Sequence, residues 1–140
     1  MGKIRVVVAD DHQAVAAKVR RVIIEECEVV AVVEDGEQAV AAVLAHDPDV
    51  LVIDISMPVL DGLQAARRLQ KLKCRVRIVF LTIHEDHDYV AAAFSYGAVG
   101  YVTKARISTD MVPAILEAIQ GHTFVSRFSP SKATLHPKPL

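Results

Sequence analysis

The sequence predicts an α/β protein with a doubly wound, five-stranded parallel sheet covered by five helices. Short runs of β-branched residues alternate with Ala-rich segments, which is the pattern of successive strand and helix units. Hydrophobic residues make up 52% of the chain but aromatic residues only 5%, so we expect a core of aliphatic side chains. The length of 140 residues suits a single domain with a sizeable core.

Five apolar runs are expected to form the strands of this sheet. Each run has four to six residues and is followed by a polar break, as is typical of buried parallel strands. The runs are IRVVVA (4–9), VVAVV (29–33), DVLVID (49–54), RIVFLT (77–82) and GYVT (100–103).

Five Ala-rich segments between and after these runs are expected to be helices. Asp35 and Asp61 each stand three residues before a glutamine, which predicts a capping box at the start of two of them. Gly97 and Gly121 follow helical patterns where a left-handed C-terminal cap is favoured, and Pro113 is expected within the first turn of the last helix. The predicted helices cover residues 13–25, 37–45, 63–72, 86–96 and 111–120.

The helical and strand patterns end near residue 125. The segment 126–140 holds three of the six prolines and has no sustained apolar period. We therefore expect a domain over residues 1–125, followed by a linker or disordered tail over residues 126–140.

The overall charge and the cysteine content favour a cytoplasmic protein. A net charge of −1 and a pI near 6.6 provide no general attraction to nucleic acid or to an anionic membrane. Cys27 and Cys74 have no metal-site spacing and are expected to be reduced thiols. No apolar run has the length of a membrane span, and the first residues lack the layout of a signal peptide.

Charged or reactive side chains follow four of the five predicted strands. Asp10 and Asp11 follow the first strand, and Asp54 ends the third. Thr82 ends the fourth strand, and Lys104 follows the fifth. Ligands of open α/β sheets bind outside the carboxyl ends of the strands, so we expect these side chains to lie in one site. Each residue alone has a structural explanation, such as a helix cap, but the set indicates function.

Three carboxylates in one cleft repel one another unless a cation lies between them. Their hard oxygen ligands favour Mg²⁺, and Mn²⁺ could replace it. Lys104 adds a positive charge suited to a phosphoryl oxygen, and Thr82 adds a hydroxyl that could donate to another. The set therefore predicts a magnesium site that handles a phosphoryl group.

Two other segments invite different functions. His84 and His87 could bind a metal from one helix face, but they do not form the H-E-x-x-H zinc pattern. The basic stretch 67–77 could bind nucleic acid, but it lacks interleaved aromatic residues and is better explained as a solvated helix face. Direct DNA binding by this chain is therefore not expected.

Two other protein classes use the residues that follow a strand in a comparable way, one as an aspartate nucleophile and one to bind a phosphate group. A phosphatase of the haloacid-dehalogenase kind would need a second aspartate where Ser56 stands. A flavodoxin-like flavin binder would need a phosphate-cradling loop after the first strand, where Asp10 and Asp11 would repel a phosphate. The sequence favours neither class.

The same residues resemble the receiver domains of bacterial two-component response regulators, which have the CheY-like fold. The resemblance runs from about residue 3 to residue 123 and rests on VADDH, VIDISMPVLDG, LTIH and GYVTKA. The segments YVAAAFSYGAVGYVTK and AILEAIQGHTFVS are similar to the NarL/LuxR-type branch. The resemblance implies the strand order 2-1-3-4-5.

The resemblance also implies a role for each acidic residue. Asp54 would accept a phosphoryl group from a phosphohistidine of a sensor histidine kinase. Asp11 and Asp54 would bind Mg²⁺ directly, together with the backbone carbonyl of Ser56, while Asp10 would hold a metal-bound water. The protein would thus catalyse only its own phosphorylation and dephosphorylation, and would not be an enzyme acting on an outside substrate.

The remaining implied roles concern the conformational switch. Lys104 would pair with the phosphoryl group, Thr82 would move to hydrogen-bond it, and Tyr101 would turn inward. Ile83 departs from the family pattern, in which a small residue is common, and could narrow access to the acceptor. His84, like Ser56, occupies a position that tunes hydrolysis of the acyl phosphate.

The resemblance leaves two outputs open. Regulators of the NarL/LuxR type continue into a helix-turn-helix domain, which would bind DNA and which this chain does not contain. The alternative is a stand-alone receiver that docks on a protein or relays phosphoryl groups. We favour transcriptional control through a further domain, and phosphorylation could also drive formation of a homodimer.

Overall fold

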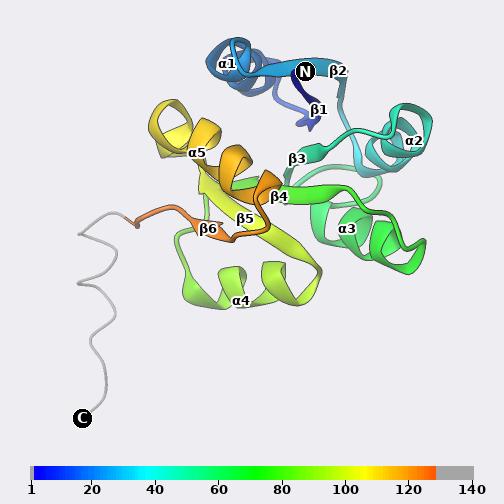
Figure 1. The fold of residues 1–140 in the computed structure, drawn as a ribbon. Helices are drawn as coiled ribbons and strands as arrows, with labels where there is room; N and C mark the ends of the chain where they lie inside the picture. Colours follow the sequence, from blue (N-terminus) through cyan, green and yellow to red (C-terminus); the bar gives the residue numbers. More distant parts are fainter. Residues whose placement is uncertain (1, 129–140) are drawn as a thin grey trace.

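Residues 2–128 are described by a computed structural model, in which six strands form one parallel sheet (Figure 1). The strand order is β2-β1-β3-β4-β5-β6, so the order predicted for the first five strands is confirmed. The direction of winding reverses at β1, which lies between β2 and β3. The strands are β1 (Ile4–Ala9), β2 (Cys27–Val33), β3 (Val50–Asp54), β4 (Arg77–Thr82), β5 (Ala98–Thr103) and β6 (Phe124–Val125).

Five α-helices and one short 3₁₀ helix connect the strands. Asp35 and Asp61 cap two of these helices, and Asp61 forms the predicted capping box with Gln64. At Asp35 the predicted box is incomplete, because the Gln38 side chain accepts from the N–H of Glu34. Gly97 and Gly121 have φ values of 93° and 84°, as expected for left-handed positions after a helix. The helices are α1 (Gln13–Ile23), α2 (Gly36–His46), α3 (Gly62–Lys71), α4 (His87–Ser95), η1 (Lys104–Arg106) and α5 (Ile107–Ile119).

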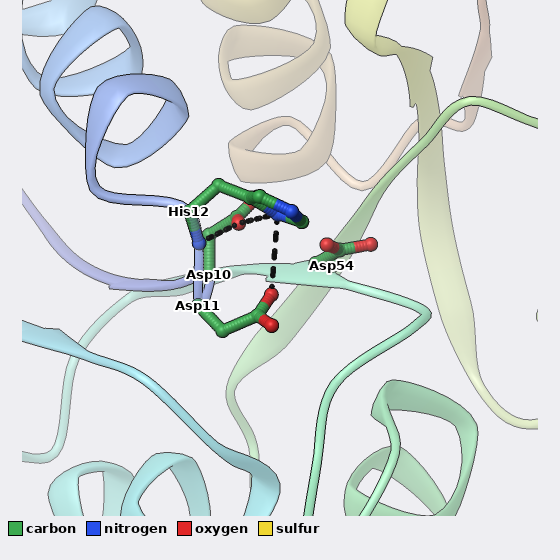
Figure 2. Close-up of side chains that lie close together, drawn as sticks. All are labelled: Asp10, Asp11, His12 and Asp54. Carbon is green, nitrogen blue, oxygen red and sulfur yellow. Dashed lines mark hydrogen bonds and ion pairs between the residues drawn. The ribbon is translucent and has the colours of Figure 1, made fainter.

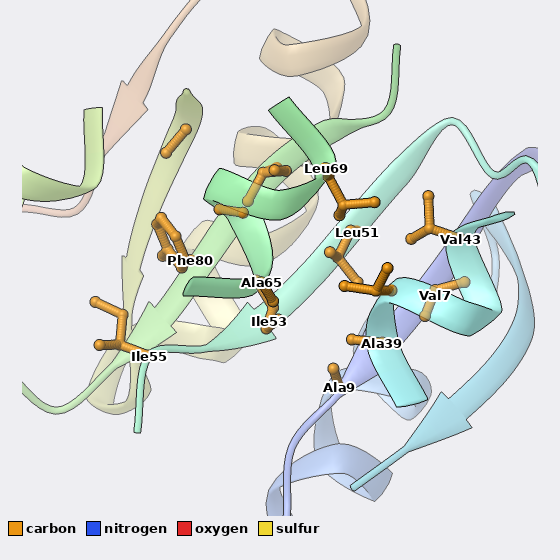
Figure 3. Packing of buried hydrophobic residues seen from close by; sticks show 14 of the residues in the cluster. Val7, Ala9, Ala39, Val43, Leu51, Ile53, Ile55, Ala65, Leu69 and Phe80 are labelled. Carbon is orange, nitrogen blue, oxygen red and sulfur yellow. The ribbon is translucent and has the colours of Figure 1, made fainter. Parts of the chain in front are cut away.

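Alternate residues of each strand pack against opposite helical layers. Val7 faces a core shared with α2, α3 and α4, whereas Val6 and Val8 face a core shared with α1 and α5. Figure 3 shows the first core, in which Leu51 and Phe80 are fully buried. Because both faces are covered, the strands are mostly apolar; charged residues lie near the strand starts, as Arg5, Glu28 and Arg77 do, or at the carboxyl ends.

The C-terminal part of the domain differs from the prediction in three ways. Helix α5 begins at Ile107 rather than at residue 111, because a polar stretch that looked like a loop is helical. Pro113 therefore lies inside the helix, where its ring removes one backbone hydrogen bond. The sheet has a sixth strand, β6, which is too short to show a sequence pattern.

The chain beyond β6 begins inside the fold. Ser126, the first residue of the predicted linker, is buried. Residues 129–140 of that segment lie outside the described residues.

Two expectations about chemistry and membranes can be compared with the structure. Cys27 and Cys74 are free thiols, and burial raises the pKa of Cys27 to about 11. Within the described range, no helix has both the length and the apolar character required to cross a membrane.

Candidate functional site

The first part of the site is the turn after β1, which carries Asp10, Asp11 and His12 (Figure 2). The Asp10 carboxylate is buried, whereas Asp11 and His12 are exposed. The backbone N–H of Asp10 donates to the carbonyl of Val33 at 3.0 Å, which ties the turn to the end of β2. Two adjacent acids are tolerated because the turn directs them into different surroundings.

The second part is Asp54, the last residue of β3. Its side chain is almost fully buried, and its Oδ1 accepts a hydrogen bond from the Ser56 N–H at 3.1 Å. A Cβ atom on Gly62 would lie 2.3 Å from the Asp54 carbonyl oxygen, so only glycine fits where α3 begins. The Asp61-Gly62 pair of the sequence motif therefore has two structural functions, a helix cap and a close approach to the Asp54 backbone.

Lys104 joins the two acidic strand ends. Its Nζ lies 2.9 Å from Asp54 Oδ2 and 3.5 Å from Asp10 Oδ2. Partial burial alone would lower the pKa of Lys104, but the hydrogen bond and charge of Asp54, helped by Asp10, raise it overall. Burial is the main cause of a raised pKa at Asp54; Lys104 and the Ser56 N–H oppose it, and the charge of Asp10 adds to it. One ammonium group does not neutralise two buried carboxylates.

The acidic cluster fits a divalent cation. Ligand atoms of Asp10, Asp11, His12 and Asp54 all lie within 4.8 Å of one another. Asp10 Oδ2 is buried and has no hydrogen-bond partner among the described residues, although Lys104 approaches it. A buried carboxylate oxygen without a donor is a group that a cation would satisfy. Carboxylates are the ligands that Mg²⁺ prefers, so the donor set matches the predicted ion.

His12 is the member of this cluster that sequence reasoning missed. Its backbone N–H donates to Asp10 Oδ1 at 2.8 Å, and its Nδ1 lies 3.3 Å from a carboxylate oxygen of both Asp10 and Asp11. Its only sequence signal was its place directly after the acidic pair, at the position that precedes the first residue of α1.

Asp54, Ser56, Ile83 and Lys104 line a pocket at the carboxyl ends of the strands. Thr82 and Tyr101 lie on the neighbouring strands β4 and β5. Thr82 ends β4 and lines the pocket with Asp54 and Lys104. Its Oγ1 accepts a hydrogen bond from the His84 N–H at 3.1 Å. The Tyr101 ring is fully buried, and its hydroxyl donates to the His84 carbonyl at 2.9 Å. Burial is the main reason that the pKa of Tyr101 is raised to about 12. Tyr101 therefore already points inward here.

The segments that suggested other functions have structural explanations. The His84 ring stacks on Tyr89 at a centroid distance of 4.0 Å, and across residues 2–128 the only group with metal-ligand geometry is the one containing Asp54. In the basic stretch, Arg68 forms an exposed ion pair with Glu37 of α2.

Comparison with known proteins identifies the family. Residues 6–116 match the family described as response regulator receiver domain. The chain belongs to this family. The signal receiver domain of the response regulator NarL from Mycobacterium tuberculosis superimposes with a TM-score of 0.84 at 32% identity, covering 87% of this chain and all of that one. A LuxR-family two-component response regulator from Aurantimonas superimposes with the same TM-score at 30% identity, covering 95% of this chain and 94% of that one.

A curated relative shows how much of a regulator the receiver domain represents. The transcriptional regulatory protein DegU from Brevibacillus brevis is 38% identical over 125 residues, which are 88% of this chain and 53% of the relative. The chain thus spans about half the length of that protein. Receiver domains bind Mg²⁺ at an acidic pocket, and in this receiver domain the acidic cluster contains Asp10, Asp11 and Asp54.

Proposed function

We propose that this receiver domain accepts a phosphoryl group on Asp54 and thereby changes conformation. The observation that carries the proposal is the 2.9 Å contact between Asp54 Oδ2 and Lys104 Nζ, beside two further acids. This arrangement supports the proposal because it brings a carboxylate, an ammonium group and further acids together at one edge of the sheet, which is what phosphoryl transfer needs.

The transfer needs an ionised and oriented acceptor. The Ser56 N–H holds Oδ1 of Asp54, and Lys104 holds Oδ2, so the carboxylate is fixed in one orientation. One oxygen of Asp54 attacks phosphorus and forms the new P–O bond. The P–N bond to the kinase histidine breaks, and its electron pair returns to the imidazole. Lys104 is then placed to neutralise the phosphoryl oxygens.

The acidic cluster would hold the metal ion. Asp11 and Asp54, with the backbone carbonyl of Ser56, would be direct ligands, and Asp10 would act through water. When bound, Mg²⁺ supplies positive charge that stabilises the transferring phosphoryl group. Mn²⁺ would substitute because it prefers the same oxygen ligands.

The conformational response would involve Thr82 and Tyr101. The Thr82 hydroxyl lines the pocket, so it is placed to donate to a phosphoryl oxygen on Asp54. That movement would take the Thr82 hydroxyl away from the His84 N–H, which donates to it. The carbonyl of the same His84 accepts a hydrogen bond from Tyr101, so Tyr101 would be affected as well. Phosphorylation would therefore favour one of two arrangements of this loop.

The partners follow from the receiver assignment. The domain would act in the cytoplasm, where a sensor histidine kinase would donate the phosphoryl group, and the phosphorylated form could dimerise. The domain would catalyse only its own phosphorylation and dephosphorylation. Because DegU is described as a transcriptional regulatory protein, we propose transcriptional control through a further domain that binds DNA. A stand-alone receiver that docks on a protein is the alternative.

Intact mass measurement tests the proposal. The protein is incubated with acetyl phosphate in the presence of Mg²⁺, Mn²⁺ or EDTA. We expect one phosphoryl adduct with either metal, stable in acid and lost in base, and no adduct in EDTA. Asp54→Asn should abolish it. An adduct of unchanged yield in Asp54→Asn would place the acceptor elsewhere, and the absence of any adduct on the unmodified protein would refute the proposal.

A further inference from the structure

A buried hydrogen-bond network connects α5 to the chain that leaves the domain. Asp110, in the first turn of α5, is 6% exposed, and Ser126 is 3% exposed. The Ser126 hydroxyl donates to Asp110 Oδ2 at 2.7 Å, and Arg106 Nε donates to the same oxygen at 2.9 Å. Burial alone would raise the pKa of Asp110, but the hydrogen bonds from Arg106, Ser126 and Thr109 lower it overall. The carboxylate is therefore an ionised, saturated acceptor.

The Ser126 hydroxyl also accepts a hydrogen bond. Its donor is the backbone N–H of Thr103 at 3.2 Å, and the Ser126 N–H in turn donates to the carbonyl of Tyr101 at 2.8 Å. Ser126 thus continues the pairing of β6 with β5 and ends it in a side-chain bond. The strand held in this way is the one that carries Tyr101.

The network holds both ends of the short segment that presents Lys104. Thr103, which precedes Lys104, is held through its N–H by Ser126. Arg106, which ends η1, is held through its guanidinium by Asp110. Since Ser126 and Asp110 are bonded to each other, one buried pair holds the backbone just before the site lysine and the Arg106 side chain just after it.

We propose that Ser126 and Asp110 are positioning residues for Lys104. The inference rests on the proposed function, because Lys104 acts there on the phosphoryl group. It also has a consequence for regulation: Ser126 directly follows β6, so the placement of residues 126–128 and the placement of Lys104 depend on each other.

The residues after Ser126 extend this connection. The ring of Phe128 lies with its centroid 6.4 Å from that of Tyr101 and 5.2 Å from that of His87, the first residue of α4. Phe128 therefore contacts Tyr101 of β5, the strand that precedes the site lysine, and the first residue of α4. A shift of the Lys104 backbone would reach Ser126 through the N–H of Thr103.

Phosphorylation rates of the full chain test the inference. The maximal rate of adduct formation with acetyl phosphate and Mg²⁺ is measured for Ser126→Ala, for Ser126→Cys and for the control Ser95→Ala. Ser95 is an exposed serine whose hydroxyl bonds only to Ala92 in its own helix. Ser126→Ala removes the hydroxyl that bonds both Asp110 and the Thr103 N–H, and we expect it to lower the maximal rate about fivefold, with the half-saturating acetyl phosphate concentration unchanged. Ser126→Cys should fall with it, because a thiol of similar size is a weak donor and acceptor.

A second background separates positioning from general stability. In Lys104→Ala, the additional change Ser126→Ala should leave the remaining rate within about twofold, because there is no ammonium group left to position. The same fivefold fall in both backgrounds, or no fall in Ser126→Ala alone, would overturn the inference.

Amide hydrogen exchange supplies a readout that does not depend on phosphorylation. Exchange at residues 103–106 should be about fivefold faster in Ser126→Ala than in Ser95→Ala. If the unmodified protein forms no adduct, the proposed function fails, and exchange still decides whether Ser126 anchors this segment; equal exchange in both variants refutes the anchoring.

Discussion

Lys104 Nζ lies 2.9 Å from Asp54 Oδ2, although the two residues are 50 positions apart in the chain. The contact exists because β3 and β5 lie on either side of β4 in one parallel sheet, so that their carboxyl ends open on the same edge. Replacing Lys104 is therefore the most direct way to test whether this ion pair contributes to phosphoryl transfer.

Replacing Lys104 with alanine should slow phosphorylation by about 100-fold, because the site loses the positive charge aimed at the transferring group. Lys104→Arg keeps the charge and is the matched control, with an expected loss smaller than that of alanine. Adduct formation from acetyl phosphate, followed by intact mass, provides the rates. Equal rates in Lys104→Ala and the unmodified protein would mean that the ion pair has no part in transfer.

Asp54→Asn should raise the free energy of unfolding at pH 7 in metal-free buffer. The pKa of Asp54 is raised in the folded state, mainly by burial, so the folded protein binds more protons than the unfolded chain once the pH rises above about 3.8. The contribution of Asp54 to stability is therefore fully present below that pH and is lost as the pH rises through the folded-state pKa. Asparagine does not titrate and avoids this loss.

Urea unfolding of both proteins at a series of pH values measures this effect. The difference between Asp54→Asn and the unmodified protein should grow as the pH rises from 3.8 and should shrink when Mg²⁺ is added, because the cation binds the folded carboxylates. A difference that does not vary with pH would assign the stabilisation to something other than the charge of Asp54.

Gly62→Ala should destabilise the protein by about 2 kcal/mol or more, since the new Cβ would lie 2.3 Å from the Asp54 carbonyl oxygen. It should also slow phosphorylation, because relief of the overlap moves the backbone that carries the acceptor. Gly2→Ala is the matched control, as a Cβ there meets nothing within 4 Å. Unfolding free energy and adduct rate are measured together; a fully stable Gly62→Ala would contradict the close approach.

Val59→Gly should raise stability by up to about 1 kcal/mol. Val59 has a φ of 68°, a left-handed conformation that is unfavourable for a β-branched residue, and its side chain is 77% exposed. Glycine removes the strain and loses little packing. It also raises the conformational entropy of the unfolded chain, which offsets part of the increase in stability. Thermal and urea unfolding provide the comparison, and a clear loss of stability would show that Val59 makes contacts that outweigh its conformation.

Much of this fold could be predicted because its main signals are local. Each buried strand is a short apolar run, and the polar residue at its end marks the edge where Asp10, Asp54 and Lys104 meet. The helix caps at Asp35 and Asp61 could likewise be predicted, because each depends on residues within a four-residue stretch of sequence.

The parts that were missed depend on tertiary contacts. Strand β6 has two residues and no pattern of its own; it forms because Ser126 and its neighbours pair with β5. The polar residues before Met111 resemble a loop, so the sequence predicts too late a start for α5, whereas in the fold Asp110 is buried and bonded to Ser126, 16 positions further along the chain. His12 gave no signal beyond its place next to Asp11.

The way the strands end has a consequence for variation among proteins of this kind. The core residues fill the two layers between sheet and helices, whereas Ser56 and Ile83, which border the acceptor pocket, are exposed at loops beyond the strand ends. If Asp54 is the acceptor, as we propose, a change at either position would alter access of water or donor to the pocket without creating a cavity in the core. We therefore expect such changes to alter the lifetime of the proposed phosphoryl group while the folding stability stays almost unchanged.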